Sequence, residues 1–249
     1  MSDSDFRDVF NLLVSTTDEY THLLPLLESI LPRLSRTDAL LDVGAGPGLF
    51  SAPLSTHFDH IGIVEPDPVY CLEAVQKILP MGKLVTAYNG VWEAARFREQ
   101  QFDLIICAHV LYFVAPETWD AFIQKMVRHL APGGRMAIAL VAKGDDASEV
   151  IRRTLGIEVP GSHPFSAAAI ECLQAHNDAF EVRSFEAGIT AETADKLLEV
   201  LALFPIMRYD KGSTKEQRLA MIEAHFKGDG HYRMPYTVDV LIVEAPGDT

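Results

Sequence analysis

Two carboxylates and three glycines in the first third of the chain have the spacing of a nucleoside-binding site. Asp42 directly precedes a turn that contains Gly44, Gly46 and Gly48, and Glu65 follows nineteen residues after Gly46. The glycines permit positive φ angles and remove the β-carbons that collide with a ligand. A carboxylate about twenty residues beyond such a turn accepts hydrogen bonds from ribose hydroxyls. The pattern predicts a strand, a ligand-binding turn and the start of a helix.

The same turn differs from a dinucleotide fingerprint. It reads D-x-G-x-G-x-G, and Leu49 stands where G-x-G-x-x-G requires its last glycine. Asp42 places negative charge where a pyrophosphate is repelled and an ammonium group is attracted. A ligand with a ribose and a cationic end fits both carboxylates. We therefore expect S-adenosyl-L-methionine (SAM) as the cofactor, with the three glycines against its methionine and ribose portions, Asp42 near its ammonium group and Glu65 on the ribose.

Alternating apolar runs predict the elements that position these residues. A helical segment at 7–34 precedes strands near 38–43, 60–65, 83–87, 102–108 and 135–142 and helices near 48–57, 67–79, 91–99 and 116–130. After Lys143 we expect helices near 146–155, 165–177, 191–204 and 214–226, a strand near 180–187 and a last strand near 236–244. Such alternation predicts an α/β fold with a doubly wound, mostly parallel sheet. Ligands of such sheets bind beyond the carboxyl ends of the strands, where the strand order reverses.

Four motifs make the chain similar to the class I, seven-strand SAM-dependent methyltransferases. They lie at 42–48, 61–67, 102–112 and 130–135, and the resemblance extends over roughly residues 38–142. It implies a Rossmann-like sheet of seven strands with an antiparallel last strand and a helical cap. It also implies one methyltransferase domain over 1–249, with the cap at 1–36, the SAM-binding core at 37–145, helical additions and the sixth strand at 146–235, and the last strand at 236–245.

The resemblance implies further cofactor contacts. Pro66 follows the second predicted strand, and Ala108 ends the fourth. The loop at 88–93 aligns with the adenine-contacting motif of the family, where Val91 replaces the usual Asp, so recognition of the adenine amino group comes from elsewhere. Trp92 has two interpretations: it stacks on the adenine ring, or it belongs to the core.

A closer resemblance is to the histamine N-methyltransferase-like proteins, at 15–19, 109–114 and 236–245. It implies a small-molecule acceptor in a water-excluding pocket lined by aromatic rings from the N-terminal segment and from the helices before the last strand. The alternative interpretation is purely structural: these rings only pack the cap against the sheet. His109 stands where that family has Gln, and Tyr236 where it has Asn, which argues against histamine itself.

Methyl transfer from a sulfonium is an in-line displacement, so much of the catalysis is alignment, and only an acceptor that loses a proton needs a base. His109 ends the fourth predicted strand, and an imidazole exchanges protons near neutral pH. We regard it as the candidate base; the other interpretations are that it only orients the acceptor, or that it is a plain packing or hydrogen-bonding residue. Tyr112, Tyr236 and Glu19, or Asp18 in place of Glu19, are predicted to orient the acceptor.

Two other functions stay open on the same motifs. In the first, a nucleophile attacks the aminocarboxypropyl carbon of SAM and not the methyl group, for example in a cyclisation to azetidine-2-carboxylate that releases methylthioadenosine. Alternatively, the protein binds SAM without turnover.

Composition excludes several classes of partner. The 249 residues carry a formal net charge of −14, which argues against nucleic acid. No apolar run approaches the ~20 residues of a membrane span, and the start lacks a signal-peptide pattern, so we expect a cytoplasmic protein. Cys71, Cys107 and Cys172 form no C-x-x-C pair, and we expect no metal site. The oligomeric state stays open.

Overall fold

The computed structural model of this chain describes residues 3–97, 100–144, 146–159 and 165–245. The chain divides into two compact units, each made of three segments. Unit 1 comprises Met1–Leu23, Val141–Ala168 and Ser184–Asp239, and unit 2 comprises Leu24–Leu140, Ala169–Arg183 and Val240–Thr249. The single domain predicted over 1–249 stays a prediction.

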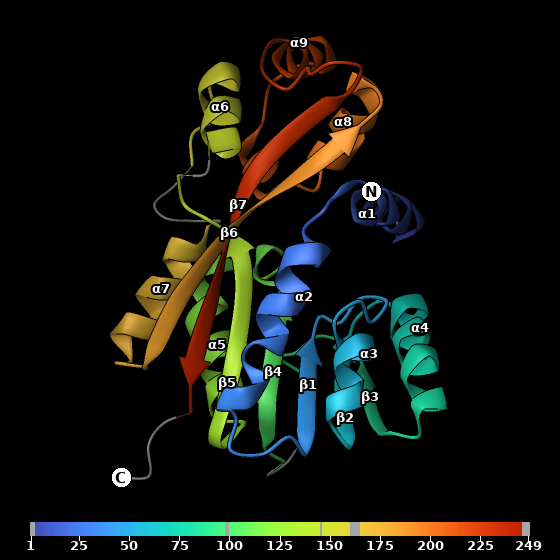
Figure 1. Cartoon of the computed structure of the whole chain (residues 1–249). Helices are drawn as coiled ribbons and strands as arrows, with labels where there is room; N and C mark the ends of the chain where they lie inside the picture. Colours follow the sequence, from blue (N-terminus) through green and yellow to red (C-terminus); the bar gives the residue numbers. More distant parts are fainter. Residues whose placement is uncertain (1–2, 98–99, 145, 160–164, 246–249) are drawn as a thin grey trace. The chain divides into compact units, whose positions relative to one another are not determined.

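One seven-stranded sheet contains all the named strands, and it confirms the predicted fold class (Figure 1). The strands are β1 (Ala39–Val43), β2 (His60–Glu65), β3 (Leu84–Asn89), β4 (Phe102–Ala108), β5 (Leu130–Val141), β6 (Phe180–Ala191) and β7 (Tyr232–Glu244). Their order is β3-β2-β1-β4-β5-β7-β6, with parallel pairing among the first five and an antiparallel last strand. The strand order reverses at β1, which pairs with β2 on one side and β4 on the other. The carboxyl ends of these three strands are the expected ligand-binding edge.

The helices of unit 2 hold this edge in place. The turn after β1 leads into α3 (Ser51–Leu54) and a 3₁₀ turn, η2 (Ser55–His57), and α4 (Pro68–Ile78) follows β2. Asp67 caps α4 by accepting hydrogen bonds from the amides of Val69 (2.8 Å) and Tyr70 (3.3 Å), and Pro68 fills the first helical position. The helix α3 contacts β1, and α4, which lies beside α3 in Figure 1, contacts β2 and β3. The cap therefore starts α4 directly after the end of β2.

Further helical elements complete the two units. The N-terminal segment forms α1 (Asp3–Thr16), α2 (Tyr20–Glu28) and η1 (Leu31–Arg33). After β2 come η3 (Leu79–Met81), η4 (Leu111–Phe113), η5 (Pro116–Thr118) and α5 (Trp119–Val127), and after β5 come α6 (Asp146–Leu155), α7 (Ser166–Ala175), α8 (Ala194–Leu201), η6 (Pro205–Tyr209) and α9 (Lys215–His225). Within unit 1, α1 packs on α8, and α6 packs on α9.

The predicted helical segment at 7–34 is interrupted at residues 17–19. Thr17 forms a β-bridge with Ile189, and its hydroxyl accepts the amide of Glu19 (3.2 Å). These interactions use backbone groups that a continuous helix needs for its own hydrogen bonds. Asp18 and Glu19 therefore lie in the break between α1 and α2 and not on a helix.

The predicted helix at 91–99 is wrong for residues 91–97, which contain a turn at 92–94 and no helix, whereas 98 and 99 lie outside the described residues. The Nζ of Lys125 on α5 donates to the carbonyl groups of Trp92 and Ala95. A helix needs these carbonyls as acceptors for its own amides. This contact joins residues about thirty positions apart, so local periodicity does not show it.

Trp92 belongs to a buried aromatic cluster of unit 2. Its Nε1 donates to the carbonyl oxygen of Phe122 (3.2 Å), and its ring packs near Phe97 and His129. The Lys125 Nζ lies 4.2 Å from the ring centroid, a cation–π contact. These contacts favour the core interpretation of Trp92, and a cofactor contact stays a prediction.

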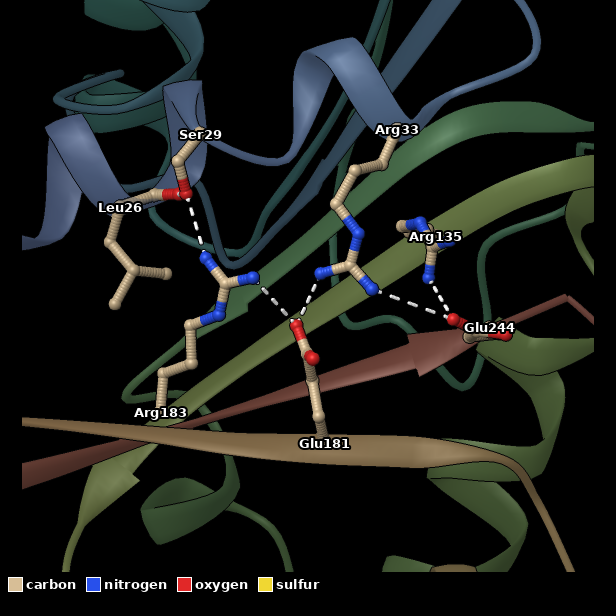
Figure 2. Close-up of polar contacts among 7 residues, drawn as sticks. All are labelled: Leu26, Ser29, Arg33, Arg135, Glu181, Arg183 and Glu244. Carbon is tan, nitrogen blue, oxygen red and sulfur yellow. Dashed lines mark hydrogen bonds and ion pairs between the residues drawn. The ribbon is translucent and has the colours of Figure 1, made fainter.

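Charged side chains tie together the three segments of unit 2. Figure 2 shows Glu181 between Arg33 and Arg183, and Glu244 between Arg33 and Arg135. Arg183 also donates to the hydroxyl of Ser29 (3.0 Å). Arg33 comes from the first segment of the unit, Glu181 from the second and Glu244 from the third. Arg33 therefore contacts both of the other segments.

We expect Arg33→Ala to lower the free energy of unfolding by about 1 kcal/mol. The pairs are partly exposed, which limits the value of each one, and Arg33 takes part in two of them. Urea unfolding gives the measurement. Lys196→Ala is the matched control, because it breaks one exposed pair with Glu192 between residues four positions apart and should leave stability nearly unchanged. Equal effects of the two substitutions would contradict the bridging role of Arg33.

Candidate functional site

The glycine turn between β1 and α3 fits closely against the residues around it. Gly44, Gly46 and Gly48 all have positive φ angles, of 72°, 52° and 78°. A Cβ on Gly44 would lie 2.3 Å from Cγ2 of Val110, and one on Gly48 would lie 3.0 Å from Ala74 of α4. Both positions therefore require glycine for conformation and for space.

The amide groups of this turn are already used inside the protein. In the turn 44–48, the first two amides donate to the carbonyl oxygen of Val64 (2.7 and 3.1 Å). The third donates to Oε2 of Glu65 (2.7 Å), and the last to the carbonyl oxygen of Ala45 (3.0 Å). Pro47 has no N–H group. A turn without available N–H donors does not bind a phosphate in the manner of a dinucleotide fingerprint.

Glu65 is a buried carboxylate fixed at the carboxyl end of β2. Besides Gly46, the amide of Asp67 donates to it, at Oε1 (2.8 Å). Asn89 donates to the carbonyl oxygens of Glu65 (2.9 Å) and Pro66 (3.0 Å), which joins the end of β3 to the end of β2. Burial raises the pKa of Glu65, although the two amide hydrogen bonds oppose this shift. The carboxylate is thus held against the glycine turn with lone pairs left for a ligand hydroxyl.

Asp42 is a second buried carboxylate, on β1, and its Oδ2 has no hydrogen-bond partner among the described residues. Burial raises the pKa of Asp42 to about 7, Ser51 offsets this only in part, and the negative charge of Glu65 adds to it. A buried carboxylate oxygen without a donor is energetically costly. A cationic ligand group near this oxygen would relieve that cost, so the Asp42 carboxylate suits the ammonium end of SAM.

We expect the unfolding free energy of the cofactor-free protein to fall as pH rises from about 4 to about 7, because of Asp42. The pKa of Asp42 is about 7 in the folded state and the ordinary pKa of an aspartate is 3.8, so the folded state binds more protons than the unfolded state in this window. The slope is at most about 1.4 kcal/mol per pH unit. Urea unfolding of wild type and Asp42→Asn across this range measures it, since the variant lacks the component. Parallel curves for the two proteins would contradict the assignment.

His109 has an unusual backbone conformation directly after β4. Its φ is 58°, a left-handed value that few residues other than glycine adopt, and its amide donates to the carbonyl oxygen of Ala139 (2.9 Å). Its Nδ1 lies 3.2 Å from the hydroxyl of Tyr112, and the two rings stack 5.6 Å apart. The next residue, Val110, contacts Gly44. Strained conformations of this kind concentrate at functional sites, and His109 lies next to a residue that touches the glycine turn.

Glu19 and Tyr236 form a buried hydrogen bond within unit 1. The Tyr236 hydroxyl donates to Oε2 of Glu19 (2.8 Å) and lies 2.7 Å from the hydroxyl of Thr17. Burial raises the pKa of Tyr236, and the nearby Glu19 carboxylate adds to the shift. Phe204 packs edge-on against the Tyr236 ring, with 5.4 Å between the centroids. Two of the predicted acceptor-orienting residues therefore contact each other directly.

Asp18 has a different set of contacts. It accepts the amide of Gly188 (2.7 Å) and pairs with Arg233 (3.0 Å). Burial raises the pKa of Asp18, but these two partners outweigh it and the net shift is downward. Of the two acidic residues considered for one role, Asp18 thus holds a structural ion pair and Glu19 bonds to Tyr236.

The predicted site residues fall into three groups. Unit 2 brings Asp42, the three glycines and Glu65 together at the ends of β1 and β2, and it pairs His109 with Tyr112. Pro66 and Val91 are exposed, and Ala108 is the last residue of β4. Glu19 and Tyr236 belong to unit 1.

Sequence reasoning assigned no contact to Val110, whose side chain lies against Gly44. No local signal marks it, because Val110 follows β4 and is far from Gly44 in the sequence. In the part of the chain that the structure describes, no three His, Cys, Asp or Glu side chains are placed to hold a metal ion, and no helix is long and apolar enough to cross a membrane.

Comparison with known proteins agrees with this geometry. Residues 40–134 match a family model described as a methyltransferase domain. The probable methyltransferase ltbC of Aspergillus luteorubrus is 28% identical over 118 residues, which are 43% of this chain and 41% of that protein. The match therefore spans less than half the length of this curated relative.

Solved structures of low sequence identity share the fold. A putative methyltransferase from Bacillus halodurans C-125 has a TM-score of 0.63 at 16% identity, covering 90% of this chain and 98% of that one. Magnesium protoporphyrin IX methyltransferase from Synechocystis PCC 6803, with bound S-adenosylhomocysteine (SAH), has a TM-score of 0.61 at 14% identity, covering 98% and 94%. N-methyltransferase NodS from Bradyrhizobium japonicum WM9, in complex with SAH, has a TM-score of 0.55 at 16% identity, covering 92% and 86%.

Residues 40–134 are thus similar to a methyltransferase domain, over less than half of the chain, and this similarity supports SAM as the cofactor.

Proposed function

We propose that the protein transfers a methyl group from SAM to a nitrogen, oxygen or sulfur atom of a small-molecule acceptor. The observation that carries the proposal is the buried Asp42 carboxylate beside a glycine turn whose amides are all engaged. This arrangement fits a cationic nucleoside and not a phosphate. The net charge of −14 supports an acceptor other than nucleic acid.

The burial and hydrogen bonds of the two carboxylates and the glycine turn support a role for each of them in cofactor binding. Asp42 attracts the ammonium group of SAM, and Glu65 accepts hydrogen bonds from the ribose hydroxyls. The glycine turn allows SAM to approach the backbone closely. In this proposal, Pro66, Val91 and Ala108 contact SAM at the carboxyl-end edge of the sheet. When bound, SAM supplies an electrophilic methyl group.

His109 takes the proton of an acceptor that must lose one, and Tyr112 holds its ring. The Tyr112 hydroxyl lies 3.2 Å from Nδ1 of His109 and the two rings stack, so Tyr112 orients the imidazole. The left-handed backbone at His109 supports this role, because it fixes where the imidazole points.

The histamine N-methyltransferase-like branch is the finer part of the proposal. It rests on the resemblance at 15–19, 109–114 and 236–245, and it favours an amine acceptor. Glu19 and Tyr236 are its candidate acceptor-orienting residues. Their hydrogen bond gives them a second, structural role within unit 1.

Product analysis tests the reaction class. Purified protein is incubated with methyl-labelled SAM and a collection of small amines, phenols and thiols, and the products are separated by chromatography. The proposal expects labelled acceptor and SAH. Methylthioadenosine without SAH would instead indicate attack on the aminocarboxypropyl carbon, and no turnover with any acceptor class would favour a SAM-binding protein.

We expect Glu65→Ala to weaken SAM binding by about 1.5–3 kcal/mol, because it removes charge-assisted hydrogen bonds to the ribose. Glu65→Gln, which keeps one acceptor oxygen, should show a smaller loss. Calorimetry gives the affinities, with the exposed Glu192→Ala as the control. Unchanged affinity in Glu65→Ala would reject the ribose role.

A further inference from the structure

The helix α4 is apolar on two opposite sides. One side is buried against β2 and β3, and it consists of Tyr70, Cys71, Ala74 and Ile78. The opposite side consists of Val69, Leu72 and Gln76 and continues into Leu79, the first residue of η3; we call these four residues the outer α4 face. Its positions are spaced three, four and three residues, so they lie on one side of the helix. Val69, Leu72 and Leu79 are 51%, 57% and 53% exposed. A helix that is apolar on both sides normally has a partner on each.

The outer α4 face is part of a larger concentration of exposed apolar side chains. Among the described residues, eight large apolar side chains are exposed, and six of them lie between Val69 and Val91. Met81, at the end of η3, and Leu84, at the start of β3, are among them. The strand β3 is an edge strand of the sheet. Contiguous exposed apolar surface marks an interaction site, and Val69, Leu72 and Leu79 lie on one side of the helix.

The outer α4 face differs in charge from the chain as a whole. Glu73 and Lys77 flank the outer α4 face and form an ion pair (2.8 Å), so the flank is neutral. The whole chain carries a formal charge of −14, and two copies repel each other elsewhere on their surfaces.

We propose that the outer α4 face is the interface of a homodimer, in which α4 packs antiparallel against α4 of a second copy around a two-fold axis. An axis between residues 75 and 76 places Leu72 opposite Leu79 of the other copy. The same axis brings Glu73 close to Lys77 of the other copy. One two-fold rotation thus brings apolar residues opposite apolar residues and opposite charges close together, as a self-complementary interface requires.

The turn after α4 leaves room for this pairing. The axis sets Val69 opposite residue 82 of the second copy, and a Cβ on Gly82 would meet no atom within 4 Å. The exposed Met81 stands beside that position and would contact Val69 of the other copy. An interface of about one helix length is small, so the dimer is expected to dissociate on dilution.

Sedimentation velocity tests the dimer at protein concentrations up to roughly 200 µM. We expect wild type to dimerise and Leu72→Glu to be monomeric. Leu72 is exposed, so its replacement should leave the fold intact, which circular dichroism checks. Val182→Glu is the matched control: it introduces the same charge at a 41% exposed apolar position of β6, and it should dimerise like wild type. A monomeric wild type, or a dimer that survives Leu72→Glu, would overturn the proposal.

Cross-linking tests the position of the axis. Gln76→Cys places a thiol next to the axis in both copies, and a short bismaleimide should link the two chains rapidly. Glu199→Cys, on the exposed side of α8, is the control position. The native cysteines are the same in both proteins and set the background. Equal linking rates for the two variants would overturn the proposed geometry, even if the protein is a dimer.

Discussion

We expect His109→Asn to lower the turnover number by about 10²–10⁴-fold while SAM affinity stays close to that of wild type. Asn is the informative replacement because, after glycine, it is among the residues that best tolerate the left-handed backbone, and φ at this position is 58°. The loss then reports the missing imidazole and not a rearranged strand end. Steady-state kinetics with calorimetric SAM affinity as the control gives the measurement.

Two further results define the role of His109. An acceptor that has no proton to lose should be methylated by His109→Asn at close to the wild-type rate, because such an acceptor needs no base. Tyr112→Phe removes the hydroxyl 3.2 Å from Nδ1 and should reduce the rate by a smaller factor. Wild-type activity of His109→Asn toward an acceptor that must lose a proton would eliminate the base and leave alignment as the source of catalysis.

We expect Gly44→Ala to destabilise the protein by about 2–4 kcal/mol and to weaken SAM binding strongly. The new methyl group would lie 2.3 Å from Cγ2 of Val110, at a residue with a φ of 72°. Either the turn or the segment after β4 must move, and both belong to the proposed site.

Gly82→Ala separates the two causes of this effect. Gly82 has the same φ, 72°, but no atom lies within 4 Å of an added Cβ, so only the backbone cost of about 1–2 kcal/mol is expected. In Gly44→Ala, adding Val110→Ala should restore part of the stability by opening space. Equal destabilisation at Gly44 and Gly82 in urea unfolding would show that the contact with Val110 is unimportant.

The sheet was predictable from sequence because its signals are local. The runs near 38–43, 60–65 and 102–108 are short, apolar and bounded by turn residues, and they form β1, β2 and β4 within one or two residues. The glycine turn and Glu65 were predictable for the same reason, since their spacing along the chain determines that they meet.

The errors arise where a distant residue decides the local structure. Lys125 takes the carbonyl groups that a helix at 91–97 needs, and Ile189 pairs with Thr17 in the middle of a predicted helix. The separate partners of Asp18 and Glu19 are equally distant: Arg233 binds the first, and Tyr236 the second. Local periodicity contains no information on such contacts.

The strain at His109 also could not be predicted. Its left-handed φ depends on how the end of β4 meets β5, where the His109 amide bonds to Ala139. The motif at 109–114 suggested a functional position, and the structure adds a backbone reason for it.

Titration of the purified chain with SAM tests the central claim most directly. The account predicts saturable binding of one SAM per chain, competition by SAH, and weaker binding once Glu65 is replaced by Ala. Because the negative charge of Asp42 attracts the ammonium group of SAM, SAM should also bind more weakly as pH falls below about 7 and Asp42 becomes protonated. Absence of binding by the folded wild-type protein to both SAM and SAH would contradict the account.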